Sequence, residues 1–103
     1  MIRNIYIVTS ICLDEEKLVR SRAWGWFSTK KEAIQATEAN YGDMCEMGYY
    51  THLVVERHAP GICSLPKAII GWWKFVRVGK RNVKVVSCPT PKTLERVGAF
   101  GLG

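Results

Sequence analysis

The chain has 103 residues and a mass of 11.7 kDa, with 48% hydrophobic residues, 23% charged residues and a formal net charge of +6. These proportions are typical of a globular protein and argue against intrinsic disorder. The length predicts a single domain over residues 1–103, with one hydrophobic core and no room for separate catalytic and regulatory domains. The longest apolar run, residues 68–73, is far shorter than the ~20 residues of a membrane-spanning helix, so no membrane contact is expected.

The positive charge is distributed unevenly along the chain. Residues 1–56 carry six Lys and Arg against eight acids, whereas residues 57–103 carry nine Lys and Arg against Glu95 alone. A surface that only keeps a protein soluble usually mixes both signs. The asymmetry therefore indicates an anionic partner, which is a phosphate-bearing small molecule, an acidic protein surface or a nucleic acid. A basic surface with no partner is the alternative.

The first two strands are predicted from their hydrophobic patterns. Residues 2–13 are apolar on both faces, which is typical of a central strand covered on both sides. Residues 18–27 alternate, and we expect the face with the small residues Ser21, Ala23 and Gly25 to pack on the core. The opposite face then presents two arginines and two tryptophans in a row: Arg20, Arg22, Trp24 and Trp26.

A helix is predicted after the second strand. Thr29 and Glu32 have the spacing of a capping box, in which Thr29 accepts a hydrogen bond from the Glu32 amide and the Glu32 carboxylate reaches back. Apolar residues recur at helical spacing from Ala33 to Tyr41, and Gly42 is expected to end the helix.

Three more strands are predicted, at residues 49–57, 69–78 and 82–87, the last two joined by a short hairpin loop. Thr90 and Pro91 are typical of the start of a second, short helix that runs to Val97. The predicted order, β-β-α-β-β-β-α, describes an α+β domain with a mainly antiparallel five-stranded sheet and one main helix packed on one face.

The sequence shows no recognisable catalytic or metal-binding motif. It contains no phosphate-binding loop, no metalloprotease motif and no serine-hydrolase motif. The four cysteines form no CxxC pair, and neither histidine has a cysteine at zinc-finger spacing. We therefore expect a protein that is not an enzyme, with no metal, no cofactor and reduced thiols in the cytoplasm.

Polar residues of the predicted third strand suggest one alternative to this expectation. Tyr50, His52 and Glu56 share one face, and His58 follows on the same face. Such a group can perform acid–base chemistry on a phosphodiester. The simpler interpretation is a solvated sheet face with ordinary polar residues.

The stronger pattern combines planar and cationic side chains. In the fourth strand, Trp72 shares a face with Lys74, and Trp73 shares the other face with Arg77. Aromatic rings stack on bases, and arginine binds phosphate through two N–H groups at once. We therefore predict an anionic-ligand site formed by Arg20, Arg22, Trp24, Trp26, Lys74, Arg77 and Arg81. The alternative is that the four tryptophans build the core, although we expect at least one of them outside it and one of Trp72 and Trp73 inside it.

One segment of the chain resembles known proteins. Residues 24–33 include an aromatic-Ser-Thr step, Phe27-Ser28-Thr29, followed by Glu32-Ala33 in the first helical turn. This arrangement after a strand resembles small β-β-α-β proteins of phage and prophage genomes, and the stretch from Trp73 to the end of the chain is similar to their C-terminal half. The resemblance implies a phage accessory protein, in the cytoplasm of an infected bacterial host, that counters host defence by binding.

Three functions are consistent with these patterns. The first is a protein that sequesters an anionic nucleotide-type ligand, as a homo-oligomer with its pocket between subunits. The second is a protein–protein inhibitor whose basic half covers an acidic host defence factor. The third is a basic nucleic-acid-binding module, with an affinity that falls with salt. We favour the first because two arginines and two tryptophans share one face of the predicted second strand, and because of the context that the resemblance to phage proteins implies.

Overall fold

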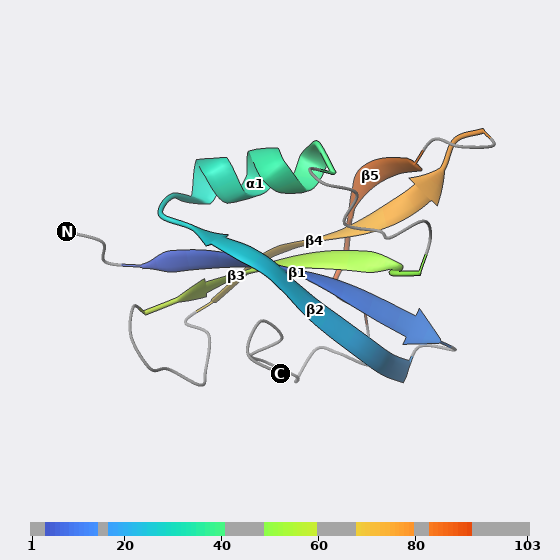
Figure 1. The fold of residues 1–103 in the computed structure, drawn as a ribbon, viewed down its shortest axis with the longest axis horizontal. Helices are drawn as coiled ribbons and strands as arrows, with labels where there is room; N and C mark the ends of the chain where they lie inside the picture. The colour runs from blue at the N-terminus through green and yellow to red at the C-terminus, as the bar shows by residue number, and fades with distance from the viewer. Residues whose placement is uncertain (1–3, 15–16, 41–48, 60–67, 80–82, 92–103) are drawn as a thin grey trace.

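The computed structural model describes residues 4–14, 17–40, 49–59, 68–79 and 83–91. They form five strands and one helix: β1 (Ile5–Asp14), β2 (Lys17–Phe27), α1 (Lys30–Glu38), β3 (His52–His58), β4 (Ala68–Arg77) and β5 (Val83–Cys88) (Figure 1). The predicted α+β class is confirmed, with a five-stranded antiparallel sheet and one helix packed on it. The order along the described chain is β-β-α-β-β-β, and the predicted last helix lies outside the described residues beyond Pro91.

The sheet places β3 at its centre. Its strand order is β2-β1-β3-β4-β5, and every neighbouring pair is antiparallel. β1 and β2 form one hairpin, β4 and β5 lie next to each other at the other side, and β3 joins the two pairs. β2 and β5 are therefore the outer strands of the sheet.

α1 covers one side of the sheet, which we call the helix face; the other side is the far face (Figure 1). The helix begins as predicted, because the Thr29 hydroxyl accepts a hydrogen bond from the Glu32 amide at 3.2 Å. The Glu32 carboxylate accepts from the Thr29 hydroxyl at 2.8 Å and from the Ser28 hydroxyl at 3.4 Å, so it bonds to side chains rather than reaching back to the backbone as predicted.

The helix ends earlier than predicted. Its last residue is Glu38, and Asn40 has a φ of 49°, in the left-handed region that terminates helices. The Ala39 amide bonds to the Gln35 carbonyl, and the Asn40 amide bonds to the Thr37 carbonyl, which closes the final turn. Asparagine tolerates this backbone conformation better than other residues with a side chain. Asn40 thus ends the helix in place of Gly42.

The main core lies between the helix and the sheet. Its buried members are Val8 of β1, Ala33 of α1, Leu53 and Val55 of β3, and Trp73 of β4. Phe27, Ile34 and Val85 are among the partly buried side chains that pack against them. Burying a large apolar side chain contributes about 1.5–3 kcal/mol, so this cluster fixes how the helix lies on the sheet.

The far face carries a second apolar cluster of Ile11, Val54 and Trp72, with Ile69 and Cys88 packed around it. Trp72 and Trp73 follow each other in β4 and therefore project to opposite faces. Their exposed fractions are 2% and 6%. The sequence predicted that one of the two points inward; both do, each into its own core cluster.

Gly71 makes room for the ring of Trp73. A Cβ atom built on Gly71 would lie 3.0 Å from Cη2 and 3.3 Å from Cζ3 of the indole. The two residues share a face of β4, so the ring of Trp73 folds back over the bare backbone of Gly71.

Within the described residues, no helix is long and apolar enough to cross a membrane.

Candidate functional site

A β-bulge in β2 separates the two tryptophans of the predicted stripe. Gly25 pairs with Val8 and Ala23 pairs with Thr9, so Trp24 is an extra residue with no partner position on β1. Residues facing each other in a sheet project to the same side. Arg22 pairs with Ser10 on the helix face, whereas Trp26 pairs with Ile7 on the far face. The predicted single row is therefore wrong: Arg20, Arg22 and Trp24 share the helix side, and Trp26 does not.

Trp24 holds the guanidinium of Arg22 in a defined place. The indole Nε1 of Trp24 donates a hydrogen bond to the hydroxyl of the buried Ser10. The ring is partly buried and packs against the core under the helix. The guanidinium carbon of Arg22 lies 4.3 Å from the centre of this ring, within the range of a cation–π interaction. The core thus positions the ring, and the ring positions the cation.

Arg20 has an aromatic partner that the sequence reasoning did not include. Its guanidinium carbon lies 5.9 Å from the centre of the Tyr49 ring. Tyr49 meets Tyr50 edge to face, with 4.9 Å between ring centres. Tyr49 precedes β3 and is 44% exposed, while Tyr50 is buried. Two arginine–aromatic pairs therefore lie along the helix side of β2. In the sequence, the only feature that could have drawn attention to Tyr49 as a site residue is the Tyr49-Tyr50 pair after Gly48.

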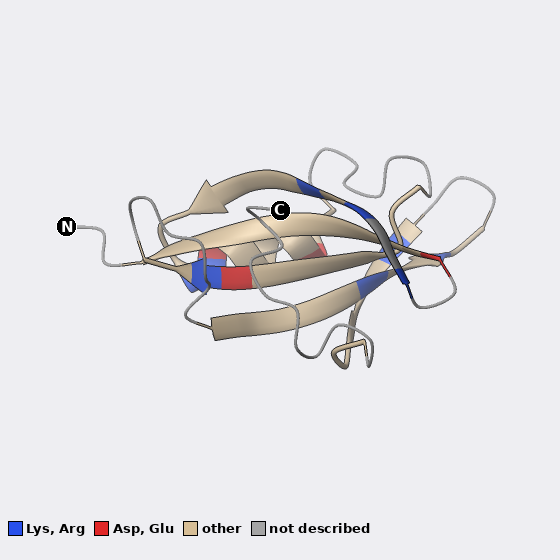
Figure 2. Ribbon diagram, turned by 90° about the horizontal axis from the view of Figure 1, so that it is seen from below, with Lys and Arg blue, Asp and Glu red and all other residues tan. Residues whose placement is uncertain are grey.

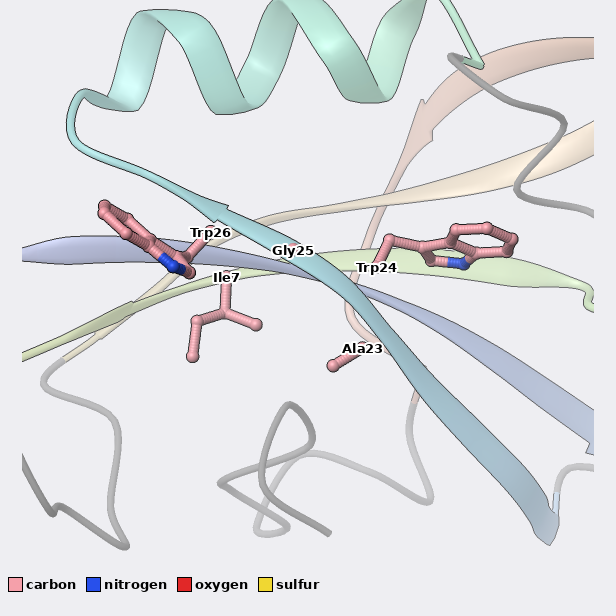
Figure 3. A pocket seen from close by; sticks show the side chains of 5 residues that line it. All are labelled: Ile7, Ala23, Trp24, Gly25 and Trp26. Carbon is pink, nitrogen blue, oxygen red and sulfur yellow. The ribbon is translucent and has the colours of Figure 1, made fainter.

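A shallow hollow opens in the C-terminal half of β2, mainly on the far face, to which Ile7, Ala23 and Trp26 project. It has a volume of about 260 Å³ and is lined by Ile7, Ala23, Trp24, Gly25 and Trp26. Figure 3 shows the two indoles on either side of Gly25, with Ile7 and Ala23 pointing away from the helix. A Cβ built on Gly25 would meet no atom within 4 Å. Trp26 is 57% exposed, so the expectation of at least one tryptophan outside the core is confirmed.

The small-residue face of β2 does not pack on the core as predicted. Ala23 and Gly25 are exposed, whereas Trp24 is partly buried under the helix. Ala23 pairs with Thr9 on the far face, whereas Gly25, after the bulge, pairs with Val8 on the helix face, so the bulge divides the predicted small-residue row between the two faces.

The remaining predicted site residues lie elsewhere in the sheet. Lys74 and Arg77 are exposed on β4, and β1 and β3 lie between β4 and β2. Neighbouring strands are ~4.8 Å apart, so these two cations are roughly 14 Å from β2 within one chain. They also project to opposite sides, because Lys74 pairs with His52 on the far face and Arg77 is three residues further along β4. Arg81 lies outside the described residues.

The polar face of β3 is buried, which corrects the interpretation as a solvated face. Glu56 and His58 are 0% and 1% exposed, and Tyr50 is 4% exposed. The His58 Nε2 atom lies 3.9 Å from the Glu56 Oε1 atom. Within the described part of the chain, neither ring nitrogen of His58 makes a hydrogen bond. No substrate reaches these groups in this arrangement, so they form a buried polar pair rather than an open acid–base site.

His52 lies on the same face but is only half-buried. Its Nδ1 atom is 2.8 Å from the hydroxyl of Thr51, and its ring meets Trp72 edge to face. Burial lowers the pKa of His52, and the charge of the facing Lys74 lowers it further. Burial also raises the pKa of the Cys88 thiol, an effect that Lys74 partly opposes. Both groups are therefore held in their neutral forms near neutral pH.

The described residues hold no group of three or more His, Cys, Asp or Glu side chains arranged to bind a metal ion. β2 is the part of the described surface best suited to hold a ligand, because it carries two arginines over aromatic rings on the helix face and a hollow between two indoles that opens mainly on the far face. No protein-family model matches the chain, and no curated protein and no solved structure matches it significantly.

Proposed function

We propose that the protein binds and sequesters an anionic ligand of the nucleotide class on β2. The planar ring of the ligand occupies the hollow at Gly25, and its phosphate reaches around the outer edge of β2 to Arg22 and Arg20 on the helix face. The observation that supports this proposal is that one outer strand carries both a hollow between two indoles and two arginines that lie over aromatic rings.

The hollow suits the ring of such a ligand. Pockets for whole small molecules usually measure roughly 300–1,000 Å³, so a space of about 260 Å³ accommodates one ring system and leaves the rest of the ligand outside. Its walls are aliphatic and aromatic, and the exposed ring of Trp26 is available for stacking. Stacking of a base on an aromatic side chain contributes ~1–3 kcal/mol.

The arginines suit the phosphate. A guanidinium that stacks on a ring keeps its five N–H donors in its own plane, pointing away from the ring. Arg22 is exposed, with its guanidinium carbon 4.3 Å from the centre of the Trp24 ring, and this placement supports a contact with a phosphate at the surface. Lys17, Arg20 and Arg22 all lie on β2, which carries no acid (Figure 2). This charge attracts an anion and excludes a cation.

The groups at this site favour binding without turnover. The residues that line the hollow are aliphatic or aromatic, and the neighbouring charged groups are guanidiniums, which stay protonated. None of them exchanges a proton near neutral pH, as a general acid or base must. Sequestration of a nucleotide signal also agrees with the accessory, anti-defence context that the resemblance to phage proteins implies.

Calorimetric titration of the purified protein with ATP, cyclic AMP and a cyclic dinucleotide tests the proposal. Arg22→Ala is expected to weaken binding more than tenfold, because a hydrogen bond to a charged group contributes ~1.5–3 kcal/mol. Trp26→Ala is expected to weaken it by a similar factor through the loss of stacking. The matched control is Lys84→Ala, which removes one exposed charge from β5 at the opposite edge of the sheet.

Two results contradict the proposal. Unchanged affinity of Arg22→Ala with a lower melting temperature means that Arg22 is structural. Binding of a single-stranded oligonucleotide, but of none of the three nucleotides, with an affinity that falls steeply with salt, favours a nucleic-acid-binding module instead.

A further inference from the structure

β5 is the outer strand at the edge of the sheet opposite to β2. Among the described residues, β4 is the only strand that pairs with β5, so in that part of the chain the other side of this six-residue strand is open (Figure 1). An open edge is a template for an added strand, and several classes of protein bind extended peptides in this way. What the edge accepts depends on where its backbone groups and its charges point.

The backbone hydrogen bonds of β4 show which residues of β5 face outward. The Phe75 amide donates to the Thr51 carbonyl at 3.0 Å, so the backbone of Phe75 is directed to the β3 side. Facing residues in antiparallel strands alternate between pairs that exchange backbone hydrogen bonds and pairs that do not. Phe75 faces Val85 in a pair of the second kind, so the N–H and C=O groups of Val85 point to the open edge. Val83 and Ser87, two residues away on either side, point the same way.

The side chains at this edge are apolar on one face and basic on the other. Val85 packs against the core on the helix face, and Val83 projects to the same side. Lys84 projects to the far face, where Lys74 of β4 is its diagonal neighbour, because Lys74 pairs with Val86. Both lysines are exposed, and neither β4 nor β5 contains an acid. A strand added here would meet valines on the helix face and positive charge on the far face.

We propose that β5 binds an extended acidic segment of another protein as an added strand of the sheet. In this segment acidic residues alternate with apolar ones. The acids meet Lys84 and Lys74 on the far face, and the apolar residues meet Val83 and Val85 on the helix face. Residues that face each other in neighbouring strands project to the same side, and opposite charges in such pairs are favourable. The site lies at the opposite edge from β2 and does not depend on the proposed nucleotide site.

Two other occupants fit this edge less well. A second copy of the chain would bring another basic β5, and each copy has a net charge of +6, so the two would repel each other. A nucleic acid binds through base stacking as well as phosphate contacts. Here Val76, the exposed residue that faces Lys84, is aliphatic, and the indole on this face of β4, that of Trp72, is buried. An acidic strand matches both the charge and the backbone of the edge.

Titration of the protein with two capped synthetic peptides tests the charge preference. Each peptide has about eight residues, a usual length for a strand; glutamate alternates with valine in one, and lysine alternates with valine in the other. We expect the glutamate peptide to bind, with an affinity that falls as salt is added, and the lysine peptide not to bind. Lys84→Ala should weaken binding by up to about fivefold through loss of a cross-strand charge pair. The matched control Lys31→Ala, which removes an exposed charge from α1, should leave the affinity unchanged.

A proline at position 87 tests the strand pairing itself. Ser87 is exposed and its amide points to the open edge, where the sheet tolerates proline, so Ser87→Pro removes a donor that an added strand needs. The matched control Ser87→Ala keeps that amide. We expect Ser87→Pro to weaken binding of the glutamate peptide by more than about tenfold and Ser87→Ala to leave it unchanged. Lys84→Glu, which keeps every backbone donor, should bind the lysine peptide in preference to the glutamate peptide.

Several results overturn the proposal. One is that the glutamate peptide does not bind, or that both peptides bind alike. Another is an equal loss of affinity in Ser87→Pro and Ser87→Ala, because the peptide then does not pair with the backbone of the edge. If circular dichroism shows that Ser87→Pro is unfolded, Lys84→Glu decides, and an unchanged peptide preference overturns the proposal. A dimer in light scattering that Ser87→Pro converts to a monomer assigns the edge to a second copy of the chain instead.

Discussion

Replacing Gly71 by alanine tests how tightly Trp73 packs in the core on the helix face. The added methyl group would lie 3.0 Å from Cη2, 3.3 Å from Cζ3 and 3.7 Å from Cζ2 of the indole. Ordinary carbon–carbon contacts are ~3.5–4.0 Å, so the ring must move by about half an ångström. Trp73 is 6% exposed and packs with Val8, Leu53 and Val55, and these neighbours restrict that movement.

The expected cost follows from two opposing effects. Overpacking a core by one methyl group costs ~1–3 kcal/mol. Alanine also reduces the conformational freedom of the unfolded chain relative to glycine, which returns ~0.4–1 kcal/mol. We therefore expect the free energy of unfolding of Gly71→Ala to fall by ~1–2 kcal/mol, with a decrease in melting temperature of roughly 5–15 °C for a domain of this size.

Urea unfolding followed by tryptophan fluorescence and circular dichroism measures this change. Gly25→Ala is the matched control, since its added methyl group meets no atom within 4 Å, and we expect unchanged or slightly increased stability. The double variant Gly71→Ala with Trp73→Phe removes most of the clash, so the two substitutions should be less destabilising together than their sum. Equal stabilities of Gly71→Ala and Gly25→Ala, or strict additivity in the double variant, would refute the packing argument.

Two further predictions concern His52 and the helix cap. The pKa of His52 is lowered in the folded state, so below its ordinary value of 6.5 the unfolded chain binds more protons and stability falls as the pH falls. His52→Gln should remove this part of the pH dependence of the unfolding free energy, which is at most ~1.4 kcal/mol per pH unit. If urea unfolding gives the variant and the unmodified protein the same pH profile, His52 is not the group responsible. Thr29→Ala should destabilise the fold by about 1 kcal/mol through loss of the cap, measured by thermal unfolding. Ser28→Ala is its control, because Ser28 makes only a 3.4 Å contact with the Glu32 carboxylate, and equal losses in both variants would show that the cap is not what stabilises the helix.

The elements with strong local patterns were predictable from the sequence. The apolar run of β1 indicated burial on both faces, and Ile7, Val8 and Ile11 are indeed buried on alternating sides. The start of α1 was predictable because Thr29 and Glu32 have the spacing of a capping box, which marks the beginning of a helix. Such signals act between neighbours in the chain and need no information about the rest of the fold.

Two features of the site were not predictable for a physical reason. The bulge at Trp24 depends on how β2 pairs with β1, and alternation along one strand does not reveal an extra residue in it. The burial of Glu56 and His58 depends on tertiary packing, which the pattern within one strand does not specify. Alternation of polar and apolar residues along a strand indicates that its two faces differ, but it does not show that the polar face is exposed to solvent.

The place of β3 in the sheet has a consequence for how the chain folds. Only two residues separate β1 from β2 in the chain, so their pairing closes a small loop, whereas β3 pairs with β1 across the whole of β2 and α1. Loop closure costs more conformational entropy as the loop lengthens, and pairings distant in sequence slow folding. The β1–β2 hairpin can therefore form early and alone, but the core under the helix needs Leu53 and Val55 and is complete only when β3 arrives. β3 also pairs with β4, which supplies Trp73 to the same core, so the central strand links the two outer pairs of strands. The folding rate should therefore depend on the pairings of β3 more than on those of either edge.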